Sequence, residues 1–141
     1  MEHQLFTPEQ LFTQAQGNST ALMLATTVYF QQRGLPLEDL VASLGSQFAR
    51  DWEPMGAHEF LEAVALNMVA VGATLQTLTG DEFEALAVIT DWPPVDALEF
   101  FRLSVQDVEV WADIFKPIAA SLDLQFERYY DGNTITYRIW R

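Results

Sequence analysis

Residues 124–140 alternate apolar and polar side chains on either side of Asp131-Gly132. Alternation with a period of two is typical of a half-buried strand, and Asp-Gly between two such runs indicates a two-residue hairpin turn. The pairs that follow from this turn are Leu124 with Ile139, Phe126 with Tyr137, and Arg128 with Ile135. The sequence therefore predicts an antiparallel hairpin over about residues 122–140.

This pairing sorts the side chains of the hairpin into an apolar and a polar face. The apolar face holds Leu124, Phe126, Ile135, Tyr137 and Ile139, and the polar face holds Gln125, Glu127, Thr134, Thr136 and Arg138. A slip of one residue would exchange the two faces, so the clean sorting supports the pairing. We expect Arg138 to be a surface residue diagonal to Glu127. Arg128 shares the apolar face, where it either borders a pocket or extends to water.

A second turn signal, Thr79-Gly80-Asp81-Glu82, predicts a hairpin over about residues 72–90. Leu75–Leu78 would form its first strand and Phe83–Thr90 its second. The second strand contains the continuous apolar run ALAVI, which is typical of a strand covered on both faces. A helix from Asp81 to Thr90 is the alternative.

Helical spacing of apolar residues predicts helices before and between the hairpins. The first would begin at Thr7 as N-cap with Pro8 after it and stop at Gly17, and the next would run from Asn18 or Ser19 to Gly34. Residues 19–33 are apolar nearly all round, which indicates burial on more than one side. Further helices are expected over residues 35–54, 56–71, 94–104 and 104–123.

The segment 104–123 carries two local signals. Ser104 and Asp107 resemble a capping box at its start, and Pro117 is expected to kink the helix or end its regular part. Its buried stripe would be Val108, Trp111, Ala112, Phe115 and Ala119. The whole chain, residues 1–141, is thus predicted to be a single α+β domain with an antiparallel sheet of about four strands, built from the two hairpins and covered by helices.

The charge of the chain limits its partners. Twenty acidic residues against seven basic ones give a net charge of −13. Such a chain repels phosphate backbones and anionic membranes, so we expect no nucleic acid and no membrane as partner. The acidity favours a cationic partner, or it reflects a salt-adapted host. The sequence shows no signal peptide and no apolar run of about 18 residues, so a cytoplasmic protein is expected.

Few residues are suited to chemistry. The chain has no cysteine, which excludes disulfides, thiolate metal sites and a cysteine nucleophile. His58 and Glu62 are spaced as metal ligands, but no third ligand follows, and a solvated first turn of a helix explains them as well. His3 is given no role. No nucleophile elbow, phosphate-binding loop or dinucleotide fingerprint occurs. We predict no catalytic residue, no metal and no cofactor.

Aromatic residues exceed what one face of a small sheet needs. They include Tyr29, Phe30, Phe48, Trp52, Phe60, Trp92, Phe100, Phe101, Trp111, Phe115, Phe126 and Tyr137. With Met23, Met55 and Met68, some of them would line a cavity between the helices and the sheet. We predict that Trp111, Phe115, Phe126 and Tyr137 border this cavity, with Arg128 near its rim to orient an apolar or anionic ligand. The alternative is that the four rings fill the space and form core.

The order of elements over residues 45–141 resembles a known group of proteins. FARDW and ALNMVAVG lead into a strand, GDEFEALAVITDWPP follows, and a helix precedes LDLQFERYYDGNTITYRI. This order is similar to the small-molecule-binding domains related to the 4-vinyl-reductase domain and to the L-2-amino-thiazoline-4-carboxylic acid hydrolase-like proteins. That group shares its fold with ligand domains of nitric-oxide signalling and Golgi transport proteins. Its members tend to carry cysteines at positions that correspond to Trp92 and Thr136, so the resemblance implies a fold and a pocket, and no activity.

Three functions are compatible with this sequence. The first is a non-enzymatic domain that binds a hydrophobic small molecule in a sensory or accessory role. The second is a homodimeric interaction or scaffold protein without a ligand, because relatives of this fold often pair and the apolar helix at residues 19–33 needs cover. The third is a hydrolase-like enzyme, against which the missing cysteine and the missing triad argue.

Overall fold

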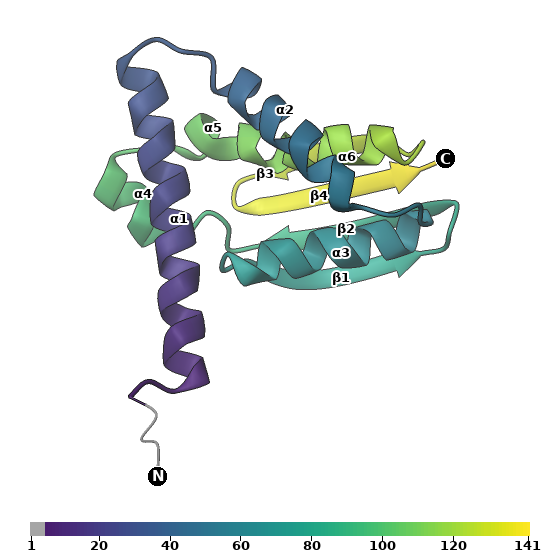
Figure 1. Ribbon diagram of the computed structural model, residues 1–141, viewed down its shortest axis with the longest axis horizontal. Helices are drawn as coiled ribbons and strands as arrows, with labels where there is room; N and C mark the ends of the chain where they lie inside the picture. Colours follow the sequence, from purple (N-terminus) through teal and green to yellow (C-terminus); the bar gives the residue numbers. More distant parts are fainter. Residues whose placement is uncertain (1–4) are drawn as a thin grey trace.

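The structure is a computed structural model that describes residues 5–141 (Figure 1). Its helices are α1 (Pro8–Gln32), α2 (Leu37–Phe48), α3 (Ala57–Ala70), α4 (Val95–Phe101), α5 (Val105–Val108) and α6 (Phe115–Ser121), with 3-10 helices η1 (Ala49–Asp51) and η2 (Glu109–Ile114). Strands β1 (Thr74–Gly80), β2 (Glu84–Thr90), β3 (Gln125–Asp131) and β4 (Thr134–Trp140) pair antiparallel in the order β1-β2-β4-β3. The predicted α+β class and the sheet from two hairpins are confirmed. His3 lies outside the described residues.

The helices cover one face of the sheet. α3 packs on β1, β2 and β4, while η2 and α6 pack on β3, and α2 lies on η2 and α6. α1 crosses the end of this arrangement, steeply inclined to the strands, and contacts α2, α4 and α5 (Figure 1). The first turns of α1 extend beyond the rest of the molecule (Figure 1).

The other face of the sheet is open, which corrects the prediction for β2. Ala85, Ala87 and Ile89 are buried under the helices, but Leu86 between them is 40% exposed. Leu86 and Val88 lie beside threonines of β1 on the open face, and no helix within residues 5–141 packs over them. The prediction that this strand is covered on both faces is therefore wrong. The alternative of a helix from Asp81 to Thr90 is also excluded, because these residues form the turn and β2.

The C-terminal hairpin has the predicted faces but a different register. Arg128 pairs with Tyr137 and Phe126 with Ile139, so each predicted partner is two positions away. The loop consists of Gly132 and Asn133, with Asp131 still paired to Thr134. Gly132 has φ 60°, a conformation that glycine adopts without strain at the first position of such a turn. A shift of two positions keeps every side chain on its face, which is why the apolar and polar sets were correct.

α1 is one continuous helix, where the sequence predicted two. Thr7 caps it with Gln10 in a reciprocal capping box. Gly17 lies in its middle, and the Ser19 hydroxyl donates to the Ala15 carbonyl oxygen at 2.9 Å as an interior helical residue. A single glycine weakens a helix by only about 1 kcal/mol relative to alanine. Within residues 19–33 of α1, only one face of the helix is buried by the described residues, and Thr20, Leu24 and Thr27 lie at its centre.

The segment 104–123 is divided into three short helices, where the sequence predicted one. The capping box of Ser104 and Asp107 is confirmed, with Ser104 N donating to Asp107 Oδ2 at 2.8 Å. The regular helix then gives way to η2, and α6 begins at Phe115. Pro117 therefore lies in the first turn of α6, where the missing N–H removes no hydrogen bond of the helix. The irregular part of the segment thus lies before Pro117, and α6 continues through this residue to Ser121.

Candidate functional site

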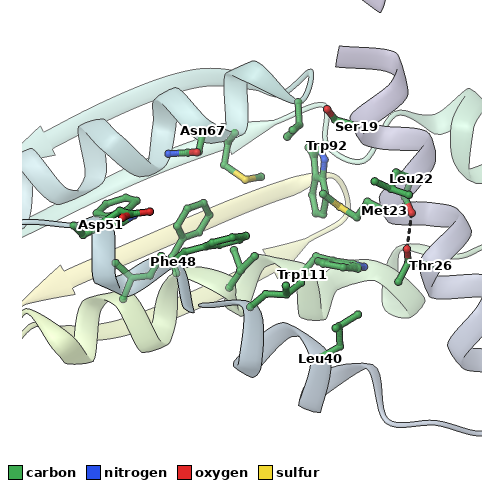
Figure 2. Close-up of a pocket in the computed structure, with 17 residues that line it drawn as sticks. Ser19, Leu22, Met23, Thr26, Leu40, Phe48, Asp51, Asn67, Trp92 and Trp111 are labelled. Atoms are coloured by element: carbon green, nitrogen blue, oxygen red, sulfur yellow. Dashed lines mark hydrogen bonds between the residues drawn. The ribbon is translucent and has the colours of Figure 1, made fainter. Parts of the chain in front are cut away.

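The site is a cavity of about 620 Å³ within the helical layer (Figure 2). Its wall is formed by α1, α2, η1, α3, the residue Trp92 and the η2–α6 segment. The cavity reaches the surface beside Leu22, which is 71% exposed, and Phe48, which is 47% exposed. An apolar space of this volume is typical of a site for a small organic molecule.

One face of α1 forms a side of the cavity. Ser19, Leu22, Met23 and Thr26 line it, and their spacing of three and four residues places them on one stripe of a helix. The Thr26 hydroxyl donates to the Leu22 carbonyl oxygen at 2.7 Å, so it is engaged within the helix (Figure 2). The sequence reasoning missed this stripe as lining, although the same spacing in residues 19–26 was the signal that would have found it.

Aromatic rings form much of the remaining wall, and they are held by contacts with one another. The aromatic lining residues are Phe48, Trp52, Trp92, Trp111 and Phe115. The ring of Trp52 lies 5.3 Å from that of Phe60 and 6.4 Å from that of Phe115, between centroids. Met23 and Met68 also line the cavity. The predicted aromatic and methionine set thus supplies a large part of the wall, while Tyr29, Phe100 and several other members lie elsewhere.

Trp92 has a donor without an acceptor. The chain turns at Asp91, which has φ 64°, and the side chain of Trp92 is only 2% exposed. Within residues 5–141 its Nε1 has no hydrogen-bond partner. Trp111, on the same wall, differs because its Nε1 donates to Thr27 Oγ1 at 2.9 Å. Buried donors are nearly always paired in proteins, so the N–H of Trp92 is an exception among the described residues.

The five residues predicted for the site fall into two groups. Trp111 and Phe115 line the cavity, whereas Phe126, Arg128 and Tyr137 are not part of its wall. Tyr137 is fully buried, and its hydroxyl donates to the Ala112 carbonyl oxygen at 3.3 Å. The Tyr137 ring lies 5.7 Å from that of Phe126 and 6.1 Å from that of Phe115. Phe115 therefore separates a packed aromatic cluster on the sheet from the cavity above it.

Arg128 is engaged with carboxylates of η2. Its Nε donates to Asp113 Oδ1 at 2.9 Å and its terminal nitrogen to Asp113 Oδ2 at 3.1 Å, while Glu109 lies 3.8 Å away. The hydrogen bond to Asp113 raises the pKa of Arg128 above its usual value. Arg128 borders a smaller recess between α1, α2 and η2, of about 420 Å³, whose wall also includes Glu38 and Asp107. This environment is acidic, so Arg128 offers no free positive charge to an anionic ligand.

Arg138 and His58 lie at the surface, but Arg138 faces Glu127 directly across the strands and not diagonally as predicted. Arg138 donates from Nε to Glu84 Oε1 at 2.9 Å and lies 3.5 Å from Glu127, its direct neighbour across the strands. His58 Nδ1 lies 3.1 Å from Glu62 Oε1 in the first turns of α3. Among residues 5–141, no three histidine, aspartate or glutamate side chains converge as metal ligands would. In the same range, no helix has the length and apolar character needed to cross a membrane.

No model of a known protein family matches the chain, and no curated protein is significantly similar to it. The resemblance of residues 45–141 to the 4-vinyl-reductase-related domains therefore stays a prediction.

Proposed function

We propose that this chain is a non-enzymatic, cytoplasmic domain that binds a hydrophobic small molecule between α1, α2, α3 and α6, in a sensory or accessory role. The observation that carries this proposal is the cavity of about 620 Å³, with its largely aromatic and aliphatic wall. Ligand pockets typically occupy about 300–1,000 Å³ and combine an apolar lining with a few polar groups. Ser19, Asp51 and Asn67 are the polar groups on this wall besides Thr26 and the indoles.

The polar groups on the wall favour binding over catalysis. The hydroxyls of Ser19 and Thr26 donate to carbonyl oxygens of their own helix. A nucleophile needs a general base within hydrogen-bond reach, and neither hydroxyl has one in the part of the chain described. These groups are suited to orient a ligand.

Native mass spectrometry of the purified protein tests this function, because it reports a retained ligand and the subunit count together. Leu22→Trp would narrow the mouth of the cavity and should reduce ligand retention. Leu66→Trp is the matched control, because Leu66 is 72% exposed on α3 but lies outside the cavity wall. Equal ligand retention in the two variants would contradict the proposal. The proposal would also be contradicted if the purified protein retained no ligand and bound no added apolar probe.

A homodimer is the second candidate, and the exposed apolar surface of α1 favours it. Phe12 and Leu22 are 53% and 71% exposed, and Phe100 of α4 beside α1 is 81% exposed. A recess between α1 and α4, lined by Gly17, Ala21 and Phe101 among others, lies on this surface. Sedimentation should show a dimer that Phe12→Glu weakens and that Phe83→Glu, at an exposed residue of the β1–β2 turn, leaves intact. A monomer at micromolar concentration would exclude it.

A further inference from the structure

The wall of the cavity carries charge at one point. Asp51 lines it, and no lysine, arginine or histidine is found among the described lining residues. Asp51 has no ion-pair partner within residues 5–141. Arg50 and Lys116, which adjoin lining residues in the sequence, are not part of the wall, and Arg128 lies outside the cavity and is bound to Asp113. An anionic ligand would thus meet a carboxylate and no compensating cation.

The carboxylate lies among aromatic rings. Asp51 ends η1, and Phe48 and Trp52 on either side of this short helix line the same cavity. Figure 2 shows Asp51 at one end of the cavity, with Trp92 toward the other end beside α1. Trp111 lies near Trp92 at the end beside α1 in the same view (Figure 2). The chain therefore brings a negative charge to one end of a space with aromatic walls.

Aromatic faces and a carboxylate both attract an organic cation. A ring presents its negative face to an ammonium group, and indole does so most strongly. A carboxylate near the surface adds a Coulomb attraction of modest size. The net charge of −13 also raises the local concentration of cations around the whole molecule.

We propose that the cavity selects a lipophilic organic cation, with its ammonium group near Asp51 and its apolar part between the rings of Trp52, Trp92 and Trp111. The inference rests on the proposed binding function and names the class of ligand for that same cavity. Asp51 would be a specificity-determining residue, because it separates cations from neutral and anionic molecules of the same shape.

Three probes with the same apolar chain test the inference: octylamine, octanol and octanoate. The amine is charged at neutral pH and the acid is ionised, so the three differ in the charge of one end. Calorimetric titration gives each affinity, and tryptophan fluorescence reports the site, because three of the four tryptophans line the cavity. We expect octylamine to bind about tenfold more tightly than octanol, and octanoate to bind most weakly.

Variants of Asp51 then assign the preference to one side chain. Asp51→Asn should reduce the affinity for octylamine about fivefold and leave that for octanol unchanged, whereas Asp51→Glu should retain the preference. Glu53→Gln removes a charge two residues away that lies outside the wall, and it should have little effect. Added salt should weaken octylamine binding to the natural chain more than to Asp51→Asn. Circular dichroism checks that each variant is folded.

The outcomes separate this inference from the function on which it rests. If octanol and octylamine bind equally, or if Glu53→Gln acts as strongly as Asp51→Asn, the preference for a cation is wrong and the binding function stands. Tightest binding of octanoate would also overturn the preference. If none of the three probes binds, both proposals fail.

Discussion

The indole Nε1 of Trp111 donates a hydrogen bond to the hydroxyl oxygen of Thr27 at 2.9 Å, and both side chains are buried. The hydroxyl of Thr27 in turn donates to the Met23 carbonyl oxygen at 3.0 Å. The bond between Trp111 and Thr27 joins α1 to η2 at the edge of the cavity. It pairs the indole N–H of Trp111, whereas the indole N–H of Trp92 on the same wall has no partner in the described residues.

Thr27→Val is expected to lower the free energy of unfolding by about 1–3 kcal/mol, because it keeps the shape of the side chain and leaves the Trp111 N–H buried without an acceptor. Urea denaturation measures the change. Thr26→Val is the control, since Thr26 bonds only to the carbonyl oxygen of its own helix. Equal effects of the two variants would show that the contact between α1 and η2 contributes little.

Arg128→Lys should destabilise the protein by about 1–2 kcal/mol. Arg128 holds Asp113 with two parallel hydrogen bonds, a geometry that the single ammonium of lysine cannot reproduce. The pair is half-buried, with side-chain exposures of 19% and 32%, which keeps the effect moderate. Arg138→Lys on the open face of the sheet should cost less than about 0.5 kcal/mol. Chemical denaturation of both variants compares them, and a larger loss for Arg138→Lys would contradict the assignment.

Gly17→Ala should raise the free energy of unfolding by about 0.5–1 kcal/mol. Gly17 lies in the middle of α1, and a Cβ added there meets no atom within 4 Å. Alanine restricts the unfolded chain and favours the helix. Gly34→Ala is the control that should destabilise, because Gly34 has φ 62° at the end of the helix. If Gly17→Ala destabilised the protein instead, α1 would not be continuous through residue 17.

Tyr130 and Tyr137 should make the protein sensitive to alkali. Burial raises the pKa of both hydroxyls above the usual value of 10.0. Above about pH 10 the unfolded chain loses these protons while the folded protein keeps them, so the free energy of unfolding falls as the pH rises. Below pH 10 this contribution is fully present. Denaturation curves at several pH values measure the loss of stability. A free energy of unfolding that stayed constant up to pH 11 would contradict the prediction.

Replacing each tyrosine by phenylalanine separates the two hydroxyls. The hydroxyl of Tyr130 is buried without a partner in the described residues, so Tyr130→Phe should leave the stability at pH 7 unchanged or higher. Tyr137→Phe loses the bond to Ala112 and should cost about 0.5–1.5 kcal/mol. Both variants should lose less stability in alkali than the natural chain. A greater cost for Tyr130→Phe at pH 7 would show that its hydroxyl has a partner in solution.

Local signals in the sequence predicted the elements of the sheet well. The alternation of residues 124–140 placed Phe126, Tyr137 and Arg138 on their correct faces, because side-chain direction depends on the parity of the register and a shift of two positions preserves it. The same signals could not identify the loop, since Asp131-Gly132 and Gly132-Asn133 are both suitable hairpin dipeptides. Gly17 was a misleading stop signal for a related reason: the packing of α1 outweighs the weak local preference of one glycine.

The candidate site was less accessible to such reasoning. An excess of aromatic and methionine residues indicated a cavity, and Trp111 and Phe115 do line it. Its other walls come from α1 and from η1, which are distant in the sequence and border the same cavity only because α1 crosses the end of the helical layer. The spacing of residues within a single segment does not show that α1 crosses the helical layer. The sequence alone therefore could not predict that Asp51, Ser19 and Trp92 line the same cavity.

The order of the strands has a consequence for how the chain folds. Each hairpin closes a short loop, and such local pairing forms within microseconds. The seam between β2 and β4 instead joins residues as distant as Glu84 and Trp140. Closing a long loop delays contacts of this kind, so the two hairpins are expected to form early and independently and to meet late in the folding reaction. The cavity, whose walls come from the segments before and between the hairpins, would then take its final shape only when the two halves of the sheet have joined.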